Sequence, residues 1–346
     1  MEALWFTIVA AMLGIYVVLD GFDFGVGVVH RYVARTDQER RTVLSAIGPV
    51  WDGNEVWLIA AGGVLFMAFP SVYATAFSGF YLALMVVLWL LILRGVAIEF
   101  RSHQENPLWR EFWDTVFALS SGMLAFVFGA ALGNLVRGVP VGPDGLRGMA
   151  LFTDFRPSKH PGIFDWYTIL VGVFAVVALG GHGALYLDWR TTGQVQVRSQ
   201  RATRWFFSML APMWIVVTVA TALVQPEIFS NLAARPWFLF FAGLALGGVG
   251  GVFYFVKQAR PLPAFLSSSI FLLGLLATTM LGNYPNWLRS TIGPEWSLTA
   301  ANSISSSASL NVAIVWWSLG MALTIAYFGY LFRTMRGKVE VESDGG

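Results

Sequence analysis

Long apolar stretches separated by short polar segments run along almost the whole chain. A transmembrane helix needs roughly 20 mainly apolar residues, so a window of about 19 residues suits the search. Nine such stretches are predicted, near residues 4–29, 51–69, 73–98, 113–136, 166–187, 205–225, 237–256, 264–282 and 310–332. The pattern predicts an all-α integral membrane protein with about nine transmembrane helices.

The second and third stretches are the least regular. Only Pro70, Ser71 and Val72 separate them, which predicts a tight helical hairpin. The first turns of the second stretch are polar, so the topology of the whole chain has to decide whether this stretch crosses the membrane. The first stretch has no basic segment before it and no small-residue cleavage site, so it is predicted to remain as a span.

Basic residues indicate the orientation. If all nine stretches cross, 15 of the 22 Lys and Arg residues fall in the C-terminal tail and in the loops after the first, third, fifth and seventh stretches. The other loops hold six, most of them in the loop 137–164. Because short basic loops stay in the cytoplasm, the N-terminus is predicted outside and the C-terminus in the cytoplasm. This uneven distribution of basic residues supports counting the second stretch as a transmembrane span.

Composition agrees with this class and excludes several kinds of site. Hydrophobic residues make up 56% of the chain and charged residues 12%, and cysteine is absent. Without cysteine the chain has no disulfides, thiolate metal sites or cysteine nucleophiles. The net charge of +2 gives no indication of nucleic-acid binding, and no nucleotide-binding loop or zinc-hydrolase motif is present.

Six charged residues interrupt the first three stretches: Asp20, Asp23, Asp52, Glu55, Arg94 and Glu99. In the predicted orientation all of them lie in the cytoplasmic half, with Asp20 roughly 13 Å from the end of its stretch. Charges inside a bilayer cost on the order of 3 kcal/mol or more each and usually have a function. Buried carboxylates can exchange protons near neutral pH, so the arrangement favours proton uptake from the cytoplasm.

Two other interpretations stay open. Arg94 can simply pair with Asp52 or Glu99, and Asp23 can cap neighbouring backbone, in which case the chain is a structural scaffold. A proton-coupled secondary transporter also gathers carboxylates in a bundle. Such transporters usually show broken helices at the membrane midplane and internal repeats, and the sequence gives no convincing sign of a repeat.

Small and aromatic residues in these stretches favour packing. Gly21, Gly25 and Gly27 are closely spaced, which allows another helix to approach. Trp51 and Trp57 flank the acidic motif, where an aromatic wall can hold a quinone ring, although tryptophans near helix ends usually form the interfacial belt.

Histidine gives little support for a cofactor on this chain. His30, His103 and His160 are expected in or beside loops, and His182 is embedded and predicted to be a hydrogen-bonded packing residue. Because a bis-histidine haem needs two histidines, neither a haem site nor a metal site is predicted.

Several motifs resemble one known family. They are Gly21-Phe-Asp-Phe-Gly-Val-Gly27, Gly48-Pro-Val-Trp-Asp-Gly-Asn-Glu-Val-Trp-Leu58, Phe77-Ser-Gly-Phe-Tyr81, Leu93-Arg-Gly-Val-Ala-Ile-Glu-Phe-Arg101, Gly133-Asn-Leu-Val-Arg-Gly-Val-Pro140 and Gly183-Ala-Leu-Tyr-Leu-Asp-Trp-Arg-Thr191. They resemble subunit II of the cytochrome bd quinol oxidases. The resemblance thins after about residue 200, where Ser309-Leu-Asn-Val312 still fits.

The resemblance implies a fold, partners and a location. The expected fold is a single polytopic domain over 1–346, with two four-helix bundles and one further helix. The first bundle covers about 1–136, the second half about 165–334, and a short cytoplasmic tail 335–346. The expected partner in the bacterial inner membrane is subunit I, which carries haems b and d, while this subunit is haem-free. Small single-span accessory subunits, membrane lipid and a structural quinone are further partners of family members.

The resemblance also implies residue roles. By motif position, Asp52 is the aspartate of the proton route, and Glu99 stands where an acid lies nearer the cytoplasmic entrance. Trp51 neighbours the quinone seen in some members, and Trp57 stands near the oxygen access path. His103 replaces a lysine of some members, which leaves the entry of the route open.

The expected function follows from both lines of reasoning. The chain is predicted to be the haem-free subunit II of a bd-type terminal oxidase, which couples quinol oxidation to reduction of oxygen to water. Asp52 and Glu99, with Asp20, Asp23 and Arg94, are predicted to serve proton uptake from the cytoplasm or to form supporting ion pairs. The chain alone is not expected to be catalytic.

Overall fold

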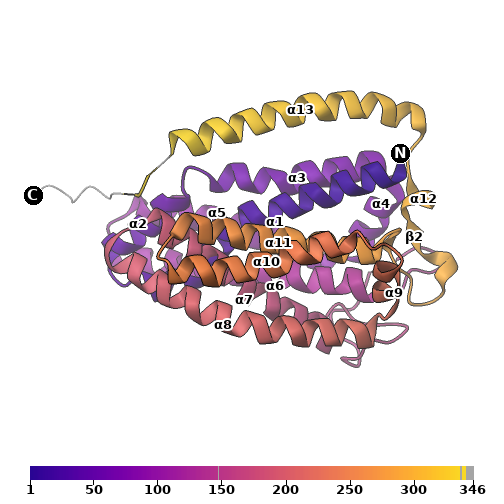
Figure 1. Ribbon diagram of the computed structural model, residues 1–346, viewed down its shortest axis with the longest axis horizontal. Helices are drawn as coiled ribbons and strands as arrows, with labels where there is room; N and C mark the ends of the chain where they lie inside the picture. Colours follow the sequence, from indigo (N-terminus) through magenta and orange to yellow (C-terminus); the bar gives the residue numbers. More distant parts are fainter. Residues whose placement is uncertain (147, 336, 340–346) are drawn as a thin grey trace, which may run out of the picture.

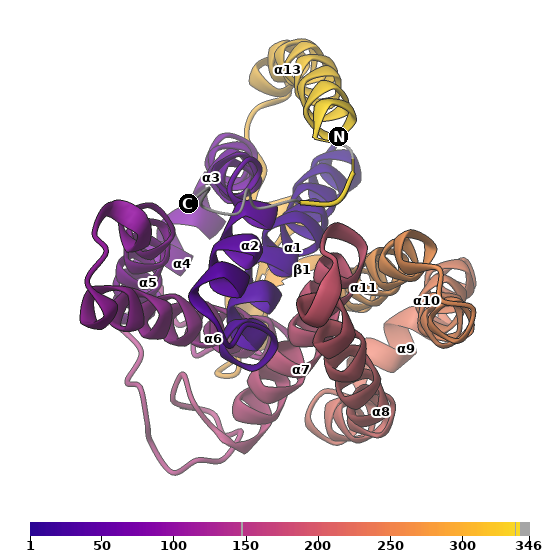
Figure 2. The ribbon, with the colours of Figure 1, turned by 90° about the vertical axis from the view of Figure 1, so that its left-hand side faces the viewer.

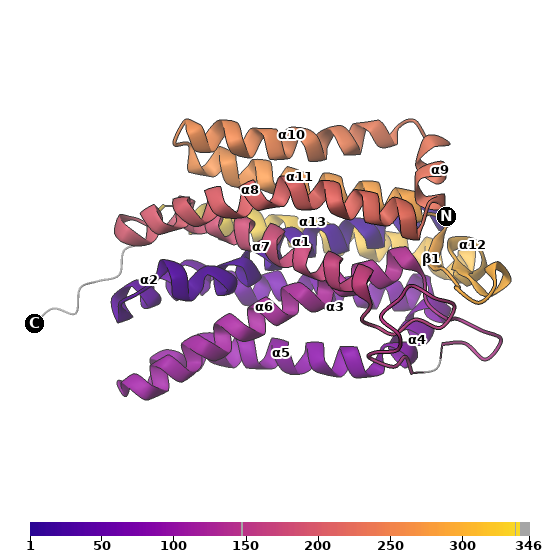
Figure 3. The same cartoon turned by 90° about the horizontal axis from the view of Figure 1, so that it is seen from below.

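The computed structural model describes residues 1–146, 148–335 and 337–339; residue 336 and residues 340–346 of the predicted tail lie outside the described residues. The long helices are α1 (Glu2–Val33), α3 (Trp51–Ala68), α5 (Tyr81–Phe100), α6 (Pro107–Arg137), α7 (Trp166–Arg190), α8 (Gly193–Val224), α10 (Phe238–Lys257), α11 (Pro261–Asn283) and α13 (Ser307–Thr334). The connecting elements are α2 (Asp37–Ile47), α4 (Pro70–Gly79), η1 (Arg101–His103), α9 (Glu227–Ala233), β1 (Asn286–Leu288), η2 (Pro294–Trp296), β2 (Leu298–Thr299) and α12 (Ala300–Ser303). The long helices run along the long axis of the molecule, and the connecting elements lie at its ends (Figures 1 and 3).

Eight helices in the described residues are long and apolar enough to cross a membrane: α1, α5, α6, α7, α8, α10, α11 and α13. The predicted span outside this group is α3, because Asp52, Asn54 and Glu55 lie in its first turns. Its 18 residues extend for about 27 Å, close to the roughly 30 Å thickness of a bilayer core. It packs along α1 (Figure 1). The all-α membrane fold is confirmed, and the count of nine stays a prediction.

The predicted tight hairpin is wrong. After α3 the chain forms the short helix α4, and α5 begins only at Tyr81. Pro70 starts α4 because its fixed φ suits the first helical position. Near the break between α4 and α5, a Cβ on Gly79 would lie 2.1 Å from Leu146, so the loop after α6 packs directly against this point. As a result α3 packs on α1, whereas α5 packs on α6.

Glycines bring α1 into contact with its neighbours. A Cβ on Gly25 would lie 1.9 Å from the Leu179 carbonyl oxygen, and one on Gly27 would lie 2.1 Å from the Ser121 hydroxyl oxygen. Backbones can approach this closely only where no side chain intervenes. The packing role predicted for the glycines of this stretch is confirmed. One apolar core includes residues of both predicted halves, so the boundary between two bundles stays a prediction.

Helix α13 lies apart from the other helices (Figure 2). None of the residues in its most apolar window is buried. Near its ends, Ser305, just before it, binds Met67 and Ala68 at 2.6 and 2.9 Å, and Arg190 donates to the Met335 carbonyl at 2.7 Å. Between them, Trp317 Nε1 donates to the Met12 sulfur of α1 at 3.4 Å. This helix fits the place of the one further helix in the predicted arrangement.

The loop after α6 is held by a buried ion pair. The Arg137 side chain is 2% exposed, pairs with Asp165 and donates to Asn134 at 2.6 Å. The backbone of Val139 then binds the Arg289 carbonyl at 2.8 Å, which joins this loop to the segment around β1 and β2. Arg137 was one of the basic residues that ran against the predicted orientation. Because buried Asp165 neutralises Arg137, this arginine is weaker evidence against the predicted orientation.

Candidate functional site

The polar residues of three helices meet inside the apolar core. We call this group the inner cluster: Asp20 and Asp23 from α1, Asn54 and Glu55 from α3, and Arg94 from α5. Four of them are fully buried, and the Glu55 side chain is 21% exposed. The predicted gathering of charges from three helices is therefore present, but its membership differs from the prediction.

Arg94 is the centre of the inner cluster. Its Nη1 donates to Asp20 Oδ1 at 2.5 Å and its Nη2 donates to Glu55 Oε2 at 2.9 Å. The guanidinium also lies 4.6 Å from the centre of the Phe24 ring. The alternative pairings of Arg94 with Asp52 or Glu99 are wrong. A single guanidinium thus holds carboxylates from two helices.

Asn54 joins Asp23 to this group. Its amide nitrogen donates to Asp23 Oδ2 at 2.9 Å and lies 3.3 Å from the Leu19 carbonyl oxygen. Asp23 therefore binds an amide of α3 and does not serve as a local backbone cap. Asn54 was not among the predicted site residues, although it stands in the acidic motif.

The inner cluster carries more acid than base. Three carboxyl groups surround one guanidinium, and an uncompensated buried negative charge is costly. Five buried polar atoms here have no hydrogen-bond partner in the described part of the chain: Tyr16 Oη, Asp20 Oδ2, Asp23 Oδ1, Asn54 Oδ1 and Arg94 Nε. Charge balance favours at least one neutral, protonated carboxyl group. The arrangement can hold a proton and pass it on.

Asp52 and Glu99 lie outside the inner cluster, and both are exposed. Successive helical residues are separated by about 100°, so Asp52 lies about 160° around α3 from Asn54, which faces α1. Glu99 is likewise about 140° around α5 from Arg94. Helical periodicity points these two acids to the outer surface, apart from the buried group, and their predicted roles in the proton route stay predictions.

The aromatic site candidates line the edges of the same helices. Trp51 packs against α5, where a Cβ on Gly95 would lie 3.2 Å from its ring. Trp57 is buried, and its ring centre lies 6.0 Å from that of Phe328 on α13. His103 is exposed, and its Nδ1 donates to the Glu99 carbonyl at 2.8 Å.

His182 binds neighbours through both ring nitrogens. Nδ1 lies 2.6 Å from the Ser268 hydroxyl oxygen, and Nε2 donates to the Val18 carbonyl at 3.0 Å. The ring stacks on Phe265 with centres 4.8 Å apart. The prediction of a hydrogen-bonded packing residue is confirmed.

A second group of charges closes the end of the molecule that carries α2. We call it the end cluster, and it contains His30, Arg31, Asp37, Arg40, Arg41, Arg101, Arg110, Glu111 and Asp114. Asp114 is its buried centre: His30, Arg40 and Arg101 bind its carboxylate at 2.7–2.8 Å. His30 lies in the last turn of α1, beside the following loop as expected, and its side chain is fully buried.

Asp37 connects α2 to the end cluster. Its carboxylate accepts from Arg101 at 2.8 Å and from Arg110 at 2.9 Å. Burial alone would raise the pKa of Asp37, but these guanidinium groups outweigh burial, and the pKa lies below its ordinary value. The helix α2 was not predicted. Its signal in the sequence is the Thr36-x-x-Glu39 capping box, which the structure forms in full.

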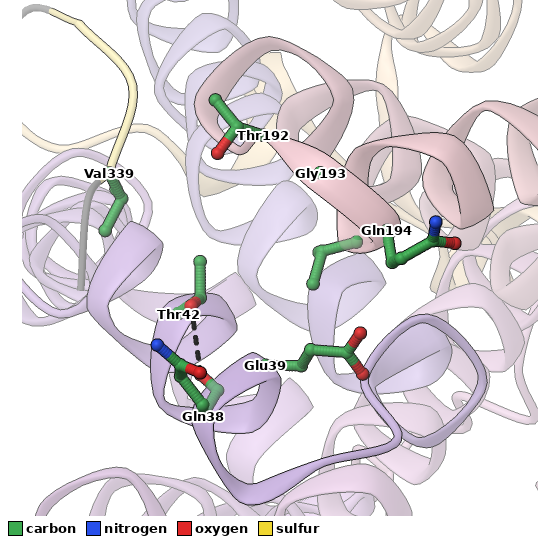
Figure 4. Close-up of a pocket in the computed structure, with 8 residues that line it drawn as sticks. Gln38, Glu39, Thr42, Thr192, Gly193, Gln194 and Val339 are labelled. Atoms are coloured by element: carbon green, nitrogen blue, oxygen red, sulfur yellow. Dashed lines mark hydrogen bonds between the residues drawn. The ribbon is translucent and has the colours of Figure 1, made fainter. Parts of the chain in front are cut away.

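A polar cavity of about 470 Å³ lies beside α2, at the same end of the molecule (Figure 4). Its lining comes from α2, the start of α8 and Val339, and includes Glu39. The carboxylate of Glu39 is already bound by Arg198 at 2.8 Å. None of the residues that line the cavity belongs to the inner cluster.

The fold and the inner cluster define a multi-spanning membrane protein with a buried, acid-rich centre. The family model for cytochrome bd terminal oxidase subunit II matches residues 1–335, and the chain belongs to this family.

Curated relatives are similar over nearly the whole chain. Cytochrome bd-I ubiquinol oxidase subunit 2 of Escherichia coli (strain K12) is 32% identical, over 98% of this chain and 95% of the relative. Cytochrome bd ubiquinol oxidase subunit 2 of Bacillus subtilis (strain 168) is 30% identical, over 89% and 88%.

The solved structure of the bd oxidase from Geobacillus thermodenitrificans includes a chain of the same fold. The TM-score is 0.74 at 17% identity, over 96% of this chain and 98% of that one. The chain is therefore a multi-pass protein of the bacterial inner membrane and a subunit of a cytochrome bd terminal oxidase.

Proposed function

We propose that this chain is the haem-free subunit of a quinol:oxygen oxidoreductase and pairs with a haem-bearing subunit I. In this complex it contributes to the uptake of cytoplasmic protons for reduction of oxygen to water. The inner cluster is the observation that carries the proposal, because three acids around one guanidinium suit proton exchange. The names of the relatives, ubiquinol oxidase subunits, supply the substrate class.

The haem-free assignment rests on the histidines. His182 uses both ring nitrogens, to Ser268 and Val18, and His30 binds Asp114 through Nε2 while its Nδ1 has no hydrogen-bond partner in the described residues. A haem iron would need such a nitrogen, or another axial ligand. We assign haems b and d to subunit I, as the family resemblance implies.

One face of α3 supports pairing with subunit I. Val56, Ile59 and Phe66 are 52%, 71% and 58% exposed, and they follow Asp52 on this face. A carboxylate beside an apolar stripe is costly against lipid. We place subunit I over this face, where it covers Asp52. Protons then pass from Glu99 to Asp52 along the contact between the subunits.

The orientation and the aromatic roles belong to the same proposal. The N-terminus is outside and the C-terminus in the cytoplasm, as the basic loops indicate, so the end cluster faces the cytoplasm. Trp51 offers a half-buried ring that fits beside a structural quinone, and Trp57 lies near the oxygen path. Lipid and small single-span accessory subunits are further proposed partners.

Replacement of Asp52 by Asn tests the proton route. The complex is purified from its native host through a tag after Gly346, and its reduced-minus-oxidised haem spectrum and oxygen consumption are measured. We expect normal haem content and at least about a tenfold lower rate, because a proton-transfer group contributes about 10²-fold or more.

The outcomes separate the proposal from its rivals. Normal haem content with an unchanged rate would reject the proton role and leave a scaffold subunit. Absence of haem and of a second chain from the purified material would favour the transporter, which family membership argues against.

A further inference from the structure

Glu55 occupies a special position between the exposed and buried acids. Around α3 it lies about 60° from Asp52, on the exposed face, and about 100° from Asn54, on the buried face. Its side chain is 21% exposed, while the Arg94 and Asp20 side chains are at 0%. Among the acids of the inner cluster, as the described residues show it, Glu55 is the one with an exposed surface.

Arg94 brings the carboxylates of Glu55 and Asp20 together. The two acids bind different terminal nitrogens of the same guanidinium, at 2.9 and 2.5 Å. Arginine keeps its proton in proteins, so the guanidinium positions both acids and does not carry the proton itself. The shared cation also keeps the pair from becoming two uncompensated negative charges.

From this geometry we infer that Glu55 is the relay through which protons pass from the exposed acids into the inner cluster. The inference rests on the proposed function, and it assigns Glu55 a role in the same route. Protonated Glu55 gives its proton to ionised Asp20, which leaves Glu55 ionised and Asp20 neutral. Arg94 stays a cation, so the total charge of the three groups is unchanged. Asp52 then gives a proton to Glu55, which makes Glu55 neutral again.

The other titratable groups near Glu55 are consistent with proton transfer from Glu55 to Asp20. Asp52 lies one turn before it on α3, and Tyr16 and Asp23 lie on α1 with Asp20. Asp23 binds the amide of Asn54 and makes no hydrogen bond to Arg94. Asp20 is therefore the acid that shares a cation with Glu55, and the relay assigns it as the acceptor.

The test replaces Glu55 by Gln, with Glu55→Asp as the conservative variant. Gln keeps an oxygen that can accept from Arg94 but cannot carry an exchangeable acid proton. Each complex is checked for haem content and reconstituted into liposomes. Oxygen consumption and the electrogenic proton uptake that follows oxygen binding are then recorded. We expect normal haem content in E55Q, uptake slowed at least about tenfold, and substantial recovery in E55D.

Glu105→Gln is the matched control. Glu105 is exposed, follows α5 and η1, and lies outside both clusters. The E105Q substitution removes a carboxylate from the same side of the membrane, so the rate of proton uptake by this variant should stay at the wild-type value. An equal slowing in E105Q would reject a specific role for Glu55.

Asp20→Asn separates the failure of this inference from failure of the proposed function. If D20N and D52N slow uptake but E55Q does not, the proton route stands and the Glu55 relay is rejected. If none of the three slows uptake, the proposed function itself fails. Loss of haem in both E55Q and E55D would also reject the relay, because it would show that the carboxylate serves assembly.

Discussion

The inner cluster and the end cluster have opposite charge balances. The inner cluster places three carboxyl groups around Arg94, and the end cluster places five arginines and His30 around three carboxylates. Excess buried acid favours retained protons, whereas excess base keeps carboxylates ionised. Under the proposed function, charge balance, more than burial, separates a cluster suited to proton exchange from one that holds helices together.

Their positions agree with this division. The end cluster joins α1, α2, η1 and α6 where these elements meet at one end of the molecule. Every carboxylate in it binds at least two basic side chains. In the inner cluster, both Asp20 and Asp23 keep one oxygen without a hydrogen-bond partner in the described residues. A carboxylate whose oxygens are all bound by basic groups holds structure, whereas a carboxyl oxygen without a partner can bind a proton.

Asp114→Asn should have the largest effect, because it removes the centre of the end cluster. His30, Arg40 and Arg101 would all lose their bonds to this buried carboxylate, although Arg101 keeps its bond to the more exposed Asp37. Breaking one side of a buried ion pair typically costs about 3–5 kcal/mol. We expect little or no assembled complex, measured as haem-bearing material recovered from membranes through the tagged chain.

Asp188→Asn is the control for this variant. Asp188 is also buried, but its Oδ1 accepts from the amides of Gln196 and Gln200 at 3.1 and 2.9 Å. An asparagine oxygen can accept the same bonds, so the yield should stay close to wild type. A normal yield of D114N would show that the end cluster does not stabilise the fold.

Much of the fold could be predicted from hydrophobic pattern alone. Each predicted stretch contains a helix, because a membrane span must satisfy its own backbone hydrogen bonds. The break between α4 and α5 was missed because both sides of it are apolar. It depends on Leu146 packing against Gly79 from a distant loop, which no local pattern shows.

Only part of the site could be predicted, because the rest depends on contacts between helices that no local pattern shows. Polar residues in apolar stretches identified Asp20, Asp23 and Arg94 correctly as a group. Spacing alone could not tell which face of α3 meets α1, so Asp52 was placed with them and Asn54 was missed. The end cluster was missed because its residues fall at helix ends, where charges are common, and most of its pairs are 64 to 84 residues apart in α1, α2, η1 and α6.

Asp20→Asn should have the next largest effect. It tests whether loss of an acid from the inner cluster slows the reaction without preventing assembly. Arg94 keeps its bond to Glu55, so no buried cation is left without a partner. We therefore expect the complex to assemble with normal haem content. Because Asn cannot accept a proton, steady-state oxygen consumption with excess quinol should fall at least about tenfold. A yield as low as that of D114N would erase the distinction between the two clusters.

Glu39→Gln should have the smallest effect, and it tests α2 through pH. Glu39 accepts from Arg198 of α8 at 2.8 Å and from the backbone N–H groups of Arg35 and Thr36 at 2.7 and 3.1 Å. Burial alone would raise the pKa of Glu39, but these donors outweigh burial, so the pKa lies below its ordinary value.

The sign of the pH dependence follows from that shift. The stabilisation is fully present above the ordinary carboxyl pKa of about 4.3 and is lost as the pH falls through the lower pKa of the folded state. At neutral pH we expect E39Q to lower the unfolding temperature slightly, for a loss of at most about 1 kcal/mol. The difference from wild type in thermal scans of the complex should shrink below about pH 4. A difference that stays constant across this range would show that Glu39 holds α2 without its charge.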